Sequence, residues 1–416
     1  MSKILVIGCG NVGGVGLHKM AQLPETFSEI HVVSRTLKKC QAVKNSIFKK
    51  TKGKVKLNIH QGDVSNKKFL LSLIKKIKPE LLVHWGHPYD NLVVMDACLK
   101  SKVKYIDTAC YENPKKYGFS HKLQWAKDKA FKKKGLLAIL GAGFDPGVSN
   151  IFSAYARDYL FDEIRTIDIL DCNGGSKDKK IKFAPNFDPE INLRELILPI
   201  EFWKNGRWEK RGRLIDEAAA YFEFDFPEAG KFTPYMMYHE EMESLVKHIP
   251  GLKRLRFWMT FSPLYLTYLR VLYNVGLTRI DPVPYNGCPV VPVKFLKAIL
   301  PRGEDFNKSY KGKTNIGNII SGLKNGRKKV VYIYNVCDHH KAFKETGGNA
   351  IGYTTAIPTV TAAKLVLEGK WSGSGVKNTE DKSLDSKIFL NEMAKVGLNW
   401  TVKELKDLPE ALKKEY

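Results

Sequence analysis

The sequence predicts an α/β protein. An N-terminal doubly wound parallel sheet is followed by a mixed α+β domain, and C-terminal helices return to the first domain. Short apolar runs alternate with helix-length segments up to residue 145, and irregularly spaced strand-like runs follow from about residue 150. With 416 residues, 44% of them hydrophobic, the chain is long enough for two domains with cores of their own.

Six short apolar segments are predicted as strands of the first sheet: 3–7, 29–33, 55–59, 80–84, 103–107 and 136–140. Helices are predicted between them at 11–23, 36–50, 66–77, 89–101 and 119–134. Runs such as Leu81-Leu-Val83 are apolar throughout, as expected of parallel strands covered on both faces. Ligands of such a sheet bind outside the carboxyl ends of its strands.

The second domain is expected to hold a largely antiparallel sheet, with strands at 165–171, 231–238, 252–261 and 328–336. Ser262 and Pro263 are typical of the start of a helix that runs to Val275. A helix over 357–369, with Pro358 in its first turn and Gly369 at its C-cap, is expected to return to the first domain. We therefore predict domains at 1–148, joined by 349–416, and at 149–348.

The first strand runs into a glycine-rich turn, Gly8-Cys-Gly10-Asn-Val-Gly13, that opens a helix. Gly8 makes the tight turn, Gly10 lets the backbone approach a pyrophosphate, and Gly13 lets helix and strand pack closely. The helix N-terminus, with Asn11 and Val12, offers free N–H groups to phosphates. The pattern predicts a Rossmann domain that binds a dinucleotide through these five residues.

The second strand ends in Ser34-Arg35-Thr36, where an NAD site usually has a carboxylate. A hydroxyl and a guanidinium suit the 2′-phosphate of NADPH, to which Arg35 could bind in a bidentate manner. We therefore predict NADPH as the cofactor, bound by Ser34, Arg35 and Thr36. The alternative is that Arg35 is an ordinary solvated residue at a strand end.

Polar turns follow the next four strands at the same edge of the sheet. Asp63 could accept from an adenine amino group, while Gly86 and Pro88 would let the chain pass close to the cofactor. The residues predicted to contact the cofactor are Asp63, Val64, Gly86, Pro88, Thr108 and Gly143, and Tyr111 is predicted to contact the substrate. The alternative is that Gly, Pro and Asp are simply turn formers here.

The composition argues against several other classes of protein. The net charge of +25 comes mostly from Lys spread along helices, which favours solvated faces, and we expect no nucleic-acid partner. The segment 257–277 resembles a membrane span but contains Pro263 and Arg270, so we expect no membrane partner. Seven cysteines without a C-x-x-C pair, and a start without a signal-like apolar stretch, predict a cytoplasmic protein without a zinc site.

Several longer segments resemble the saccharopine dehydrogenase superfamily, and within it the carboxynorspermidine/carboxyspermidine dehydrogenase branch. The resemblance runs from the first strand to about Trp371. The segments are the glycine turn, Ser34–Thr36, Gly143–Gly147, Phe161–Ile164, Asp171–Gly175, Asn186–Glu190, Phe224–Pro227, Arg256–Phe261 and Tyr332–Asn335 with Asp338-His339. The sequence departs from the branch between Trp208 and Phe224.

The resemblance implies a homodimeric, NADPH-dependent enzyme of bacterial polyamine synthesis. Such an enzyme joins L-aspartate 4-semialdehyde to putrescine or 1,3-diaminopropane through an imine, and reduces the imine to carboxyspermidine or carboxynorspermidine. The choice between the two diamines stays open, because one methylene is worth only about 1–3 kcal/mol in a pocket. Two alternatives also stay open: a saccharopine reductase-like enzyme with another amine, and a non-catalytic Rossmann sensor.

This chemistry needs groups that orient the substrates and stabilise charge beside the cofactor. Asp145 is the candidate catalytic carboxylate, because its turn lies at the active edge and an anion there stabilises a cationic amine or iminium. The alternative is that Asp145 caps a helix that starts at Pro146.

Further candidate substrate-binding residues lie in the second domain. Asn173 and Gly174 would reach over the substrate, unless they only form a tight turn. His239, Glu240 and Asn335 are weaker candidates, as is His339 beside Asn335. Glu240 could bind the distal ammonium of a diamine or simply begin a solvated helix.

A dicationic diamine also requires a local acidic pocket in a strongly basic protein. We therefore expect at least one further carboxylate to converge with Asp145 near the nicotinamide. The carboxylate of the semialdehyde needs a cation, and Arg194, Arg213 and Arg256 all remain candidates.

Overall fold

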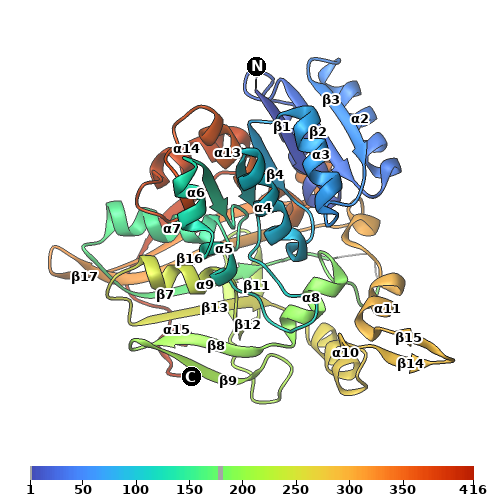
Figure 1. The fold of residues 1–416 in the computed structure, drawn as a ribbon. Coiled ribbons are helices and arrows are strands. Elements are labelled where there is room, and N and C mark those ends of the chain that lie inside the picture. Colours follow the sequence, from blue (N-terminus) through green and yellow to red (C-terminus); the bar gives the residue numbers. More distant parts are fainter. Residues whose placement is uncertain (1, 177–180) are drawn as a thin grey trace.

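The computed structural model describes residues 2–176 and 181–416, and it contains two large sheets (Figure 1). The first sheet is parallel, with the order β18-β6-β5-β4-β1-β2-β3. Its strands are β1 (Lys3–Ile7), β2 (Glu29–Ser34), β3 (Lys56–Gln61), β4 (Leu81–His84), β5 (Lys104–Asp107), β6 (Leu137–Leu140) and β18 (Gly375–Asn378). The six predicted strands are confirmed. The strand order reverses between β1 and β4, which places a ligand crevice beside the glycine turn.

Helices cover both faces of this sheet. They are α1 (Asn11–Met20), α2 (Leu37–Thr51), α3 (Lys67–Ile77), η1 (Pro88–Asp90), α4 (Asn91–Ser101), α5 (Lys122–Trp125) and α6 (Asp128–Lys133). In α3, buried Leu70, Leu73 and Ile77 recur at helical spacing and pack on the sheet. The single helix predicted over 119–134 was wrong, because the chain bridges at Phe119 and then forms two short helices.

The second sheet is mixed, with the order β19-β17-β16-β7-β13-β8-β9 and β12 beside β13. Its strands are β7 (Glu163–Cys172), β8 (Pro199–Lys204), β9 (Arg207–Arg213), β12 (Pro234–Met237), β13 (Arg254–Thr260), β16 (Lys313–Lys324), β17 (Arg327–Asp338) and β19 (Thr401–Leu405). Only β7 and β13 pair in parallel among these described strands, so the predicted largely antiparallel sheet is confirmed.

The sequence prediction missed β16, the long strand at the middle of this sheet. Its glycines and asparagines are poor strand formers, which hid it. The neighbouring strands require those glycines. An added Cβ at Gly317 would lie 2.3 Å from the Ile333 carbonyl oxygen, and one at Gly322 would lie 1.9 Å from the Glu163 carbonyl oxygen.

The C-terminal segment contributes one strand to each sheet. β18 extends the first sheet beside β6, whereas β19 pairs with β17 in the second sheet. The prediction grouped all of 349–416 with the first domain, and β19 departs from that grouping.

Helix α13 (Ala350–Leu367) packs against α1 and both sheets. The predicted helix over 357–369 was wrong at its start, because Asn349 caps the helix and Pro358 lies inside it. By length and composition α13 is the one helix among the described residues that could span a membrane, although 78% of it is buried in the molecule. A core helix passes the same test. The span-like segment 257–277 instead forms the end of β13 and the helix α10 (Pro263–Asn274), which Ser262 caps as predicted.

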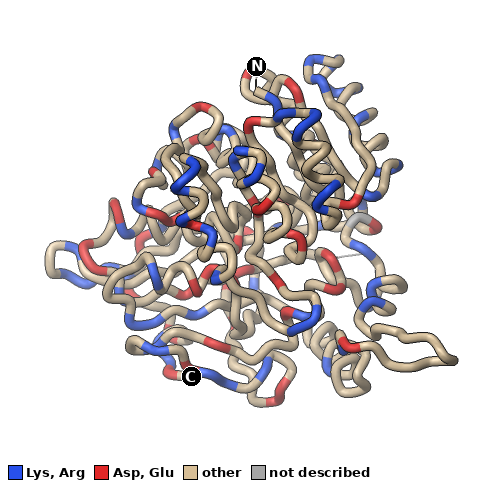
Figure 2. Tube along the Cα trace, in the orientation of Figure 1, with Lys and Arg blue, Asp and Glu red and all other residues tan. Residues whose placement is uncertain are grey.

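Shorter elements complete the second domain and the C-terminal segment. They are α7 (Val148–Tyr155), η2 (Ala156–Leu160), α8 (Pro189–Leu196), β10 (Phe224–Phe226), β11 (Gly230–Phe232), α9 (Glu241–His248), β14 (Val283–Tyr285), β15 (Cys288–Val290), α11 (Pro292–Ile299), η3 (Gly303–Phe306), α12 (His339–Thr346), α14 (Ser386–Val396) and α15 (Glu410–Lys413). The predicted strand 231–238 is in fact two strands, β11 and β12, in different sheets. Lys and Arg are spread over both domains and interspersed with Asp and Glu (Figure 2).

Candidate active site

The glycine turn has the geometry that a dinucleotide requires. Gly8 has a φ of +97°, and an added Cβ would lie 2.6 Å from the Trp85 carbonyl oxygen. A Cβ at Gly13 would lie 2.3 Å from the Gly8 carbonyl oxygen, whereas one at Gly10 would face open space. Gly10 is thus where a pyrophosphate could approach the backbone, at the uncapped N-terminus of α1.

Asn11 has a role that the motif did not predict. Its side chain donates to Asn349 at 3.2 Å and accepts from Asn307 at 3.0 Å, so it ties the turn to α13 and to the second domain. Val12 is half-buried and packs against the core. Contact of these two residues with a cofactor remains a prediction.

The segment after β2 is open to solvent at Arg35 and Thr36. Ser34 Oγ accepts from the Thr36 N–H at 3.3 Å, and the Arg35 backbone carbonyl accepts from Gln61. The Arg35 guanidinium also contributes to lowering the pKa of Asp63, although hydrogen bonds from Ser65 lower it more. One carboxylate oxygen of Asp63 accepts a hydrogen bond from Ser65 Oγ at 2.8 Å, within its own turn.

The other predicted cofactor contacts lie at the same edge of the sheet. Val64 is buried, Pro88 begins η1, and a Cβ at Gly86 would lie 2.7 Å from the His84 ring. Gly143 packs tightly, because its Cβ would lie 3.3 Å from the Thr108 carbonyl oxygen. These positions fit a crevice along the carboxyl ends of the strands.

Asp145 stands in the loop between β6 and α7, half-buried. The helix begins at Val148 and its N-cap is Gly147, whose N–H donates to the Asn150 side chain at 2.9 Å. The alternative that Asp145 caps a helix starting at Pro146 was therefore wrong. The Asp145–Pro146 peptide bond is cis.

Asp145 meets side chains of the second domain in a group that we call the acidic cluster: Asp145, Asp171, Glu195, His239 and Glu241. Asp145, His239 and Glu241 offer side-chain atoms that all lie within 4.8 Å of one another. His239 lies between two carboxylates, with Nδ1 bonded to Glu241 and Nε2 at 3.1 Å from Glu195. The expected convergence of another carboxylate with Asp145 is thus present.

The charge state of the cluster follows from burial and proximity. Burial by itself would lower the pKa of His239, but Glu241 and Glu195 raise it well above its ordinary value. Burial, followed by the nearby Asp171 carboxylate, raises the pKa of Asp145 well above its ordinary value. Burial also raises the pKa of Asp171 to about 7. The surroundings therefore favour a charged His239 and disfavour the ionised forms of Asp145 and Asp171.

Glu240 and Tyr111 both belong to the contact between α9 and the loop after β5. Glu240 accepts from the Cys110 N–H at 2.5 Å, and burial raises its pKa to about 8, so it is not a solvated helix start. The Tyr111 N–H donates to Gln124 at 2.8 Å. Both remain candidates for substrate binding.

Asn173 contacts the acidic cluster through Asp171, whereas Gly174 and Asn335 have other partners. Asn173 Nδ2 donates to Asp171 at 3.0 Å. The Gly174 carbonyl accepts from His339 Nε2 at 3.1 Å, and the Ala350 N–H donates to His339 Nδ1, which makes His339 a structural residue. The Asn335 amide donates to the Asn399 carbonyl at 2.5 Å, so the structure does not bring it to Asp145.

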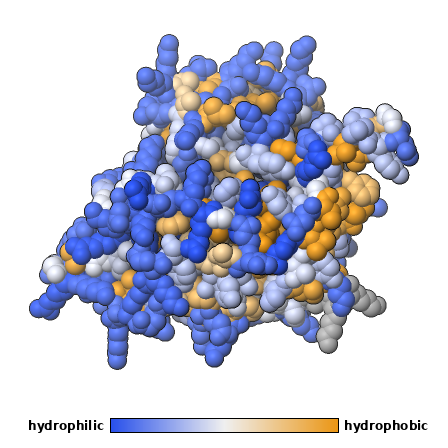
Figure 3. Space-filling view, turned by 90° about the horizontal axis from the view of Figure 1, so that it is seen from below, coloured by the Kyte–Doolittle hydropathy of each residue, from blue (hydrophilic) through white to orange (hydrophobic). Residues whose placement is uncertain are grey.

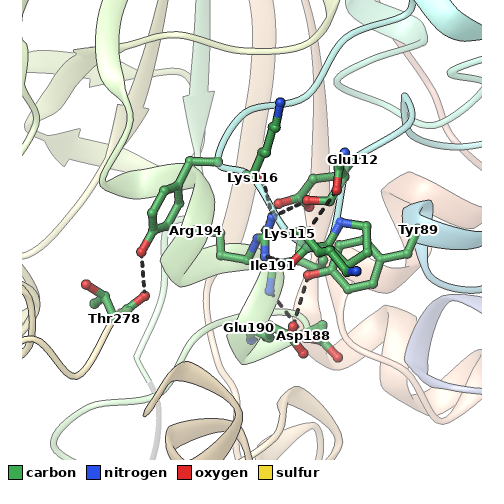
Figure 4. A network of polar contacts seen from close by, with 12 residues as sticks. Tyr89, Glu112, Lys115, Lys116, Asp188, Glu190, Ile191, Arg194 and Thr278 are labelled. Atoms are coloured by element: carbon green, nitrogen blue, oxygen red, sulfur yellow. Dashed lines mark hydrogen bonds and ion pairs between the residues drawn. The ribbon is translucent and has the colours of Figure 1, made fainter. Parts of the chain in front are cut away.

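Two of the three candidate arginines, Arg194 and Arg256, are buried and bound by other parts of the protein. Arg194 is buried against Glu112 and donates to the carbonyls of Asn113, Pro114 and Lys116, in a network with Tyr89 and Glu190 (Figure 4). Arg256 is buried against Asp168 and the C-terminal carbonyls.

Arg213 donates to the Ile197 carbonyl at 3.2 Å. Arg194 and Arg256 are therefore engaged by the fold, whereas Arg213 is only half-buried and remains a candidate for the substrate carboxylate. A cation that the sequence did not single out is Lys297 of α11. It reaches Asp188 at 2.8 Å and His87 at 3.3 Å, beside the loop after β4.

Two family models match this chain in tandem. The saccharopine dehydrogenase NADP binding domain matches residues 4–139, and the saccharopine dehydrogenase C-terminal domain matches residues 143–398. The chain belongs to the saccharopine dehydrogenase family. It is an NADP-dependent oxidoreductase of that family, as the resemblance implied.

Curated relatives in the family are similar over nearly their whole length. The carboxyaminopropylagmatine dehydrogenase of Synechocystis sp. is 43% identical over 400 residues, which are 96% of this chain and 97% of the relative. The carboxynorspermidine synthases of Vibrio cholerae and Vibrio alginolyticus are 41% and 40% identical, each over 97% of both chains. The apo saccharopine dehydrogenase (L-Glu forming) of Saccharomyces cerevisiae superposes with a TM-score of 0.70 at 14% identity over 97% of this chain and 100% of its own, which shows the shared fold.

Asp171, Glu195 and Glu241 were missed as site residues by sequence reasoning. Glu241 follows two candidates, His239 and Glu240, and Asp171 lies two residues before Asn173, near the end of β7. The tertiary structure brings them together, because β12, which precedes His239, pairs with β13, and β13 pairs with β7, which carries Asp171. We expect that the acidic cluster of this protein does not bind a metal ion. Both nitrogens of His239 already bind carboxylates, which leaves no lone pair to ligate a metal.

Proposed function

We propose that this protein catalyses the NADPH-dependent reductive condensation of L-aspartate 4-semialdehyde with putrescine or 1,3-diaminopropane. The products are carboxyspermidine or carboxynorspermidine, in polyamine synthesis. The names of the two Vibrio relatives support the norspermidine chemistry. The acidic cluster supports a cationic amine as the substrate.

The observation that carries the proposal is the net charge of the acidic cluster. Four carboxyl groups, those of Asp145, Asp171, Glu195 and Glu241, gather there around a single histidine, His239. The cluster is thus an anionic site inside a protein whose net charge is +25. An anionic pocket attracts an ammonium that the rest of the surface repels.

The residues have separate tasks in this reaction. When bound, the cofactor supplies the hydride that reduces the C=N carbon. Asp145 lies in the loop after β6, at the edge of the sheet that carries the glycine turn, where an anion stabilises the iminium. Asn173 orients Asp171, and the salt-bridged His239 keeps Glu241 and Glu195 in place.

A second amine is favoured by the relative from Synechocystis, whose name contains agmatine. A guanidinium is planar and suits bidentate carboxylates, whereas an ammonium acts as a point charge. Agmatine and a diamine differ in the charged group at the end that is distant from the reacting nitrogen. Glu240, which contacts the loop after β5, is the candidate to bind that group.

The test is an NADPH oxidation assay at a fixed concentration of the semialdehyde with putrescine, 1,3-diaminopropane, agmatine and, as a control, lysine. Turnover with a diamine supports the first assignment, and preference for agmatine supports the second. If glutamate with 2-aminoadipate 6-semialdehyde is the preferred pair in a parallel assay, the enzyme is a saccharopine reductase and both assignments fail.

We also propose that the protein is a cytoplasmic homodimer. Large apolar side chains are exposed on α10, α11 and the β14–β15 hairpin, and Figure 3 shows hydrophobic residues gathered at the right of the view, where these elements lie. They are Leu264, Tyr268, Val271, Val275, Tyr285, Phe295 and Ile299. A patch of this kind usually marks an interface.

The dimer is tested by light scattering after gel filtration. Val271→Glu combined with Val275→Glu should convert the protein to a monomer, because two charges would be buried at the interface. Val402→Glu, an exposed valine on β19, is the matched control that should stay dimeric. A monomeric wild-type protein would contradict the proposal.

A further inference from the structure

Asp145 and Asp171 come from different parts of the chain and meet at the junction of the two sheets. Asp145 follows β6 of the first sheet, and Asp171 lies near the end of β7 in the second. Asp171 is only 3% exposed. One of its oxygens accepts from Asn173 Nδ2 at 3.0 Å, and its other oxygen is buried without a hydrogen-bond donor among the described residues. The Asp145 carboxyl is a neighbour that interacts with Asp171.

A hydrogen bond between two carboxyl groups requires a proton on one of them. Two carboxylates that share a site cannot both ionise readily, because like charges repel strongly away from water. The surroundings add to this effect from every side that packs on the pair. Glu241 of α9 is a second anion, while the only adjacent cation among the cluster residues, His239, is bound to Glu241 and Glu195.

We propose that Asp171 is a positioning residue that keeps a proton on Asp145, so that Asp145 acts as the acid that expels water from the carbinolamine. This inference rests on the proposed function. Asp145 would touch the reacting atoms, and Asp171 acts through it. His239 is a poorer donor for this step, because both of its ring nitrogens are held by carboxylates.

The step balances without any further reagent. The neutral amine attacks the aldehyde carbon, the nitrogen loses a proton and the oxygen gains one, which gives the carbinolamine. The Asp145 carboxyl then transfers its proton to the hydroxyl, the C–O bond breaks, and water leaves with the bonding electrons. The nitrogen lone pair forms the C=N bond, and the Asp145 carboxylate faces the resulting iminium until hydride reaches the carbon.

Replacing Asp171 by Asn tests the sharing of the proton. An amide can donate to the Asp145 carboxylate, which favours its ionised form. In the wild type, burial and Asp171 raise the pKa of Asp145, so turnover should fall only at alkaline pH. In Asp171→Asn the alkaline limb of the kcat profile should move to lower pH by about one unit or more, with activity retained on the acid side.

Asp225→Asn, an exposed carboxylate on β10, is the matched control and should leave the profile unchanged. Asp145→Asn should lower kcat about 10²-fold or more at every pH, which is the range expected of a general acid. An unchanged alkaline limb in a folded Asp171→Asn protein would overturn the proposal.

A second measurement needs no turnover. Infrared titration of the wild-type protein with ¹³C-labelled aspartate should show a protonated carboxyl group that persists at neutral pH and is lost in Asp145→Asn. Its absence from the wild type would overturn the inference. If that band is present but no diamine is turned over, the proposed function fails and the shared proton stands.

Discussion

At the residue scale, burial decides which charged side chains remain available to a substrate. Arg194, Arg213 and Arg256 looked equivalent in the sequence, yet each donates to backbone carbonyls in the structure. His239 looked like a lone strand-end histidine, yet two carboxylates hold it as a cation. The sequence shows the residue types, and the partners of each side chain decide its role.

Arg35 is predicted to select the cofactor. Arg35→Ala should raise the KM for NADPH about tenfold or more, because a charge-assisted contact to the 2′-phosphate is lost. The KM for NADH should stay unchanged, since NADH lacks that phosphate. Steady-state kinetics with both cofactors checks this, and an equal loss with NADPH and NADH would contradict it.

Asp145 is predicted to reduce stability while it serves the reaction. Its pKa is raised in the folded state, so the fold disfavours the ionised form. The wild type should therefore lose stability as pH rises above about 4, the ordinary carboxyl value, towards the raised folded value. Asp145→Asn removes this loss, so its advantage in Tm should grow from pH 4.5 to pH 7.5. A pH-independent difference would count against a raised pKa.

At the scale of elements, local patterns predicted the first domain well and the second domain poorly. Strands β1, β4 and β6 are short apolar runs, because helices cover both faces of a parallel sheet. Strand β16 lacks this apolar pattern, since the neighbouring strands leave no room for a side chain at Gly317 and Gly322. Helix α13 begins before its predicted start because the Asn349 cap outweighs the internal Pro358.

Asn349 is predicted to couple the cap of α13 to the cofactor turn. It accepts from the Gly352 N–H at 3.0 Å and from Asn11 at 3.2 Å. Asn349→Ala should cost about 1–2 kcal/mol of stability and also raise the KM for NADPH. Asp385→Ala removes the cap of α14 and is the control, with a similar stability loss and an unchanged KM. Equal KM values for both variants would contradict the coupling.

At the scale of the whole molecule, the two domains are joined by buried polar contacts and by the C-terminal segment. Arg194 of α8 is bound by loops of the first domain, and Figure 4 shows how Tyr89, Glu112 and Glu190 surround it. The C-terminal segment passes through both sheets, with β18 in one and β19 in the other. The cluster around Asp145 lies where these connections hold the two sheets against each other.

Loss of the buried pair between Arg194 and Glu112 should weaken the whole molecule. Arg194→Leu leaves Glu112 buried without its counter-charge, which costs about 3–5 kcal/mol. Arg207→Leu removes an arginine that is 78% exposed in its pair with Glu209, and should cost about 1 kcal/mol or less. Chemical denaturation of both variants checks the contrast, and similar losses would refute it.

The sequence by itself determined the Rossmann sheet, the glycine turn and the family, and it placed Asp145 in a loop at the carboxyl edge of the sheet. These features are local, because a turn, an amphipathic helix and an apolar strand are specified by residues close together in the chain. Only the tertiary structure decided that Asp171, Glu195 and Glu241 join Asp145, and that Arg194 and Arg256 do not. Partners, burial and charge state depend on contacts between distant segments, here the pairing of β7, β13 and β16, which no local pattern encodes.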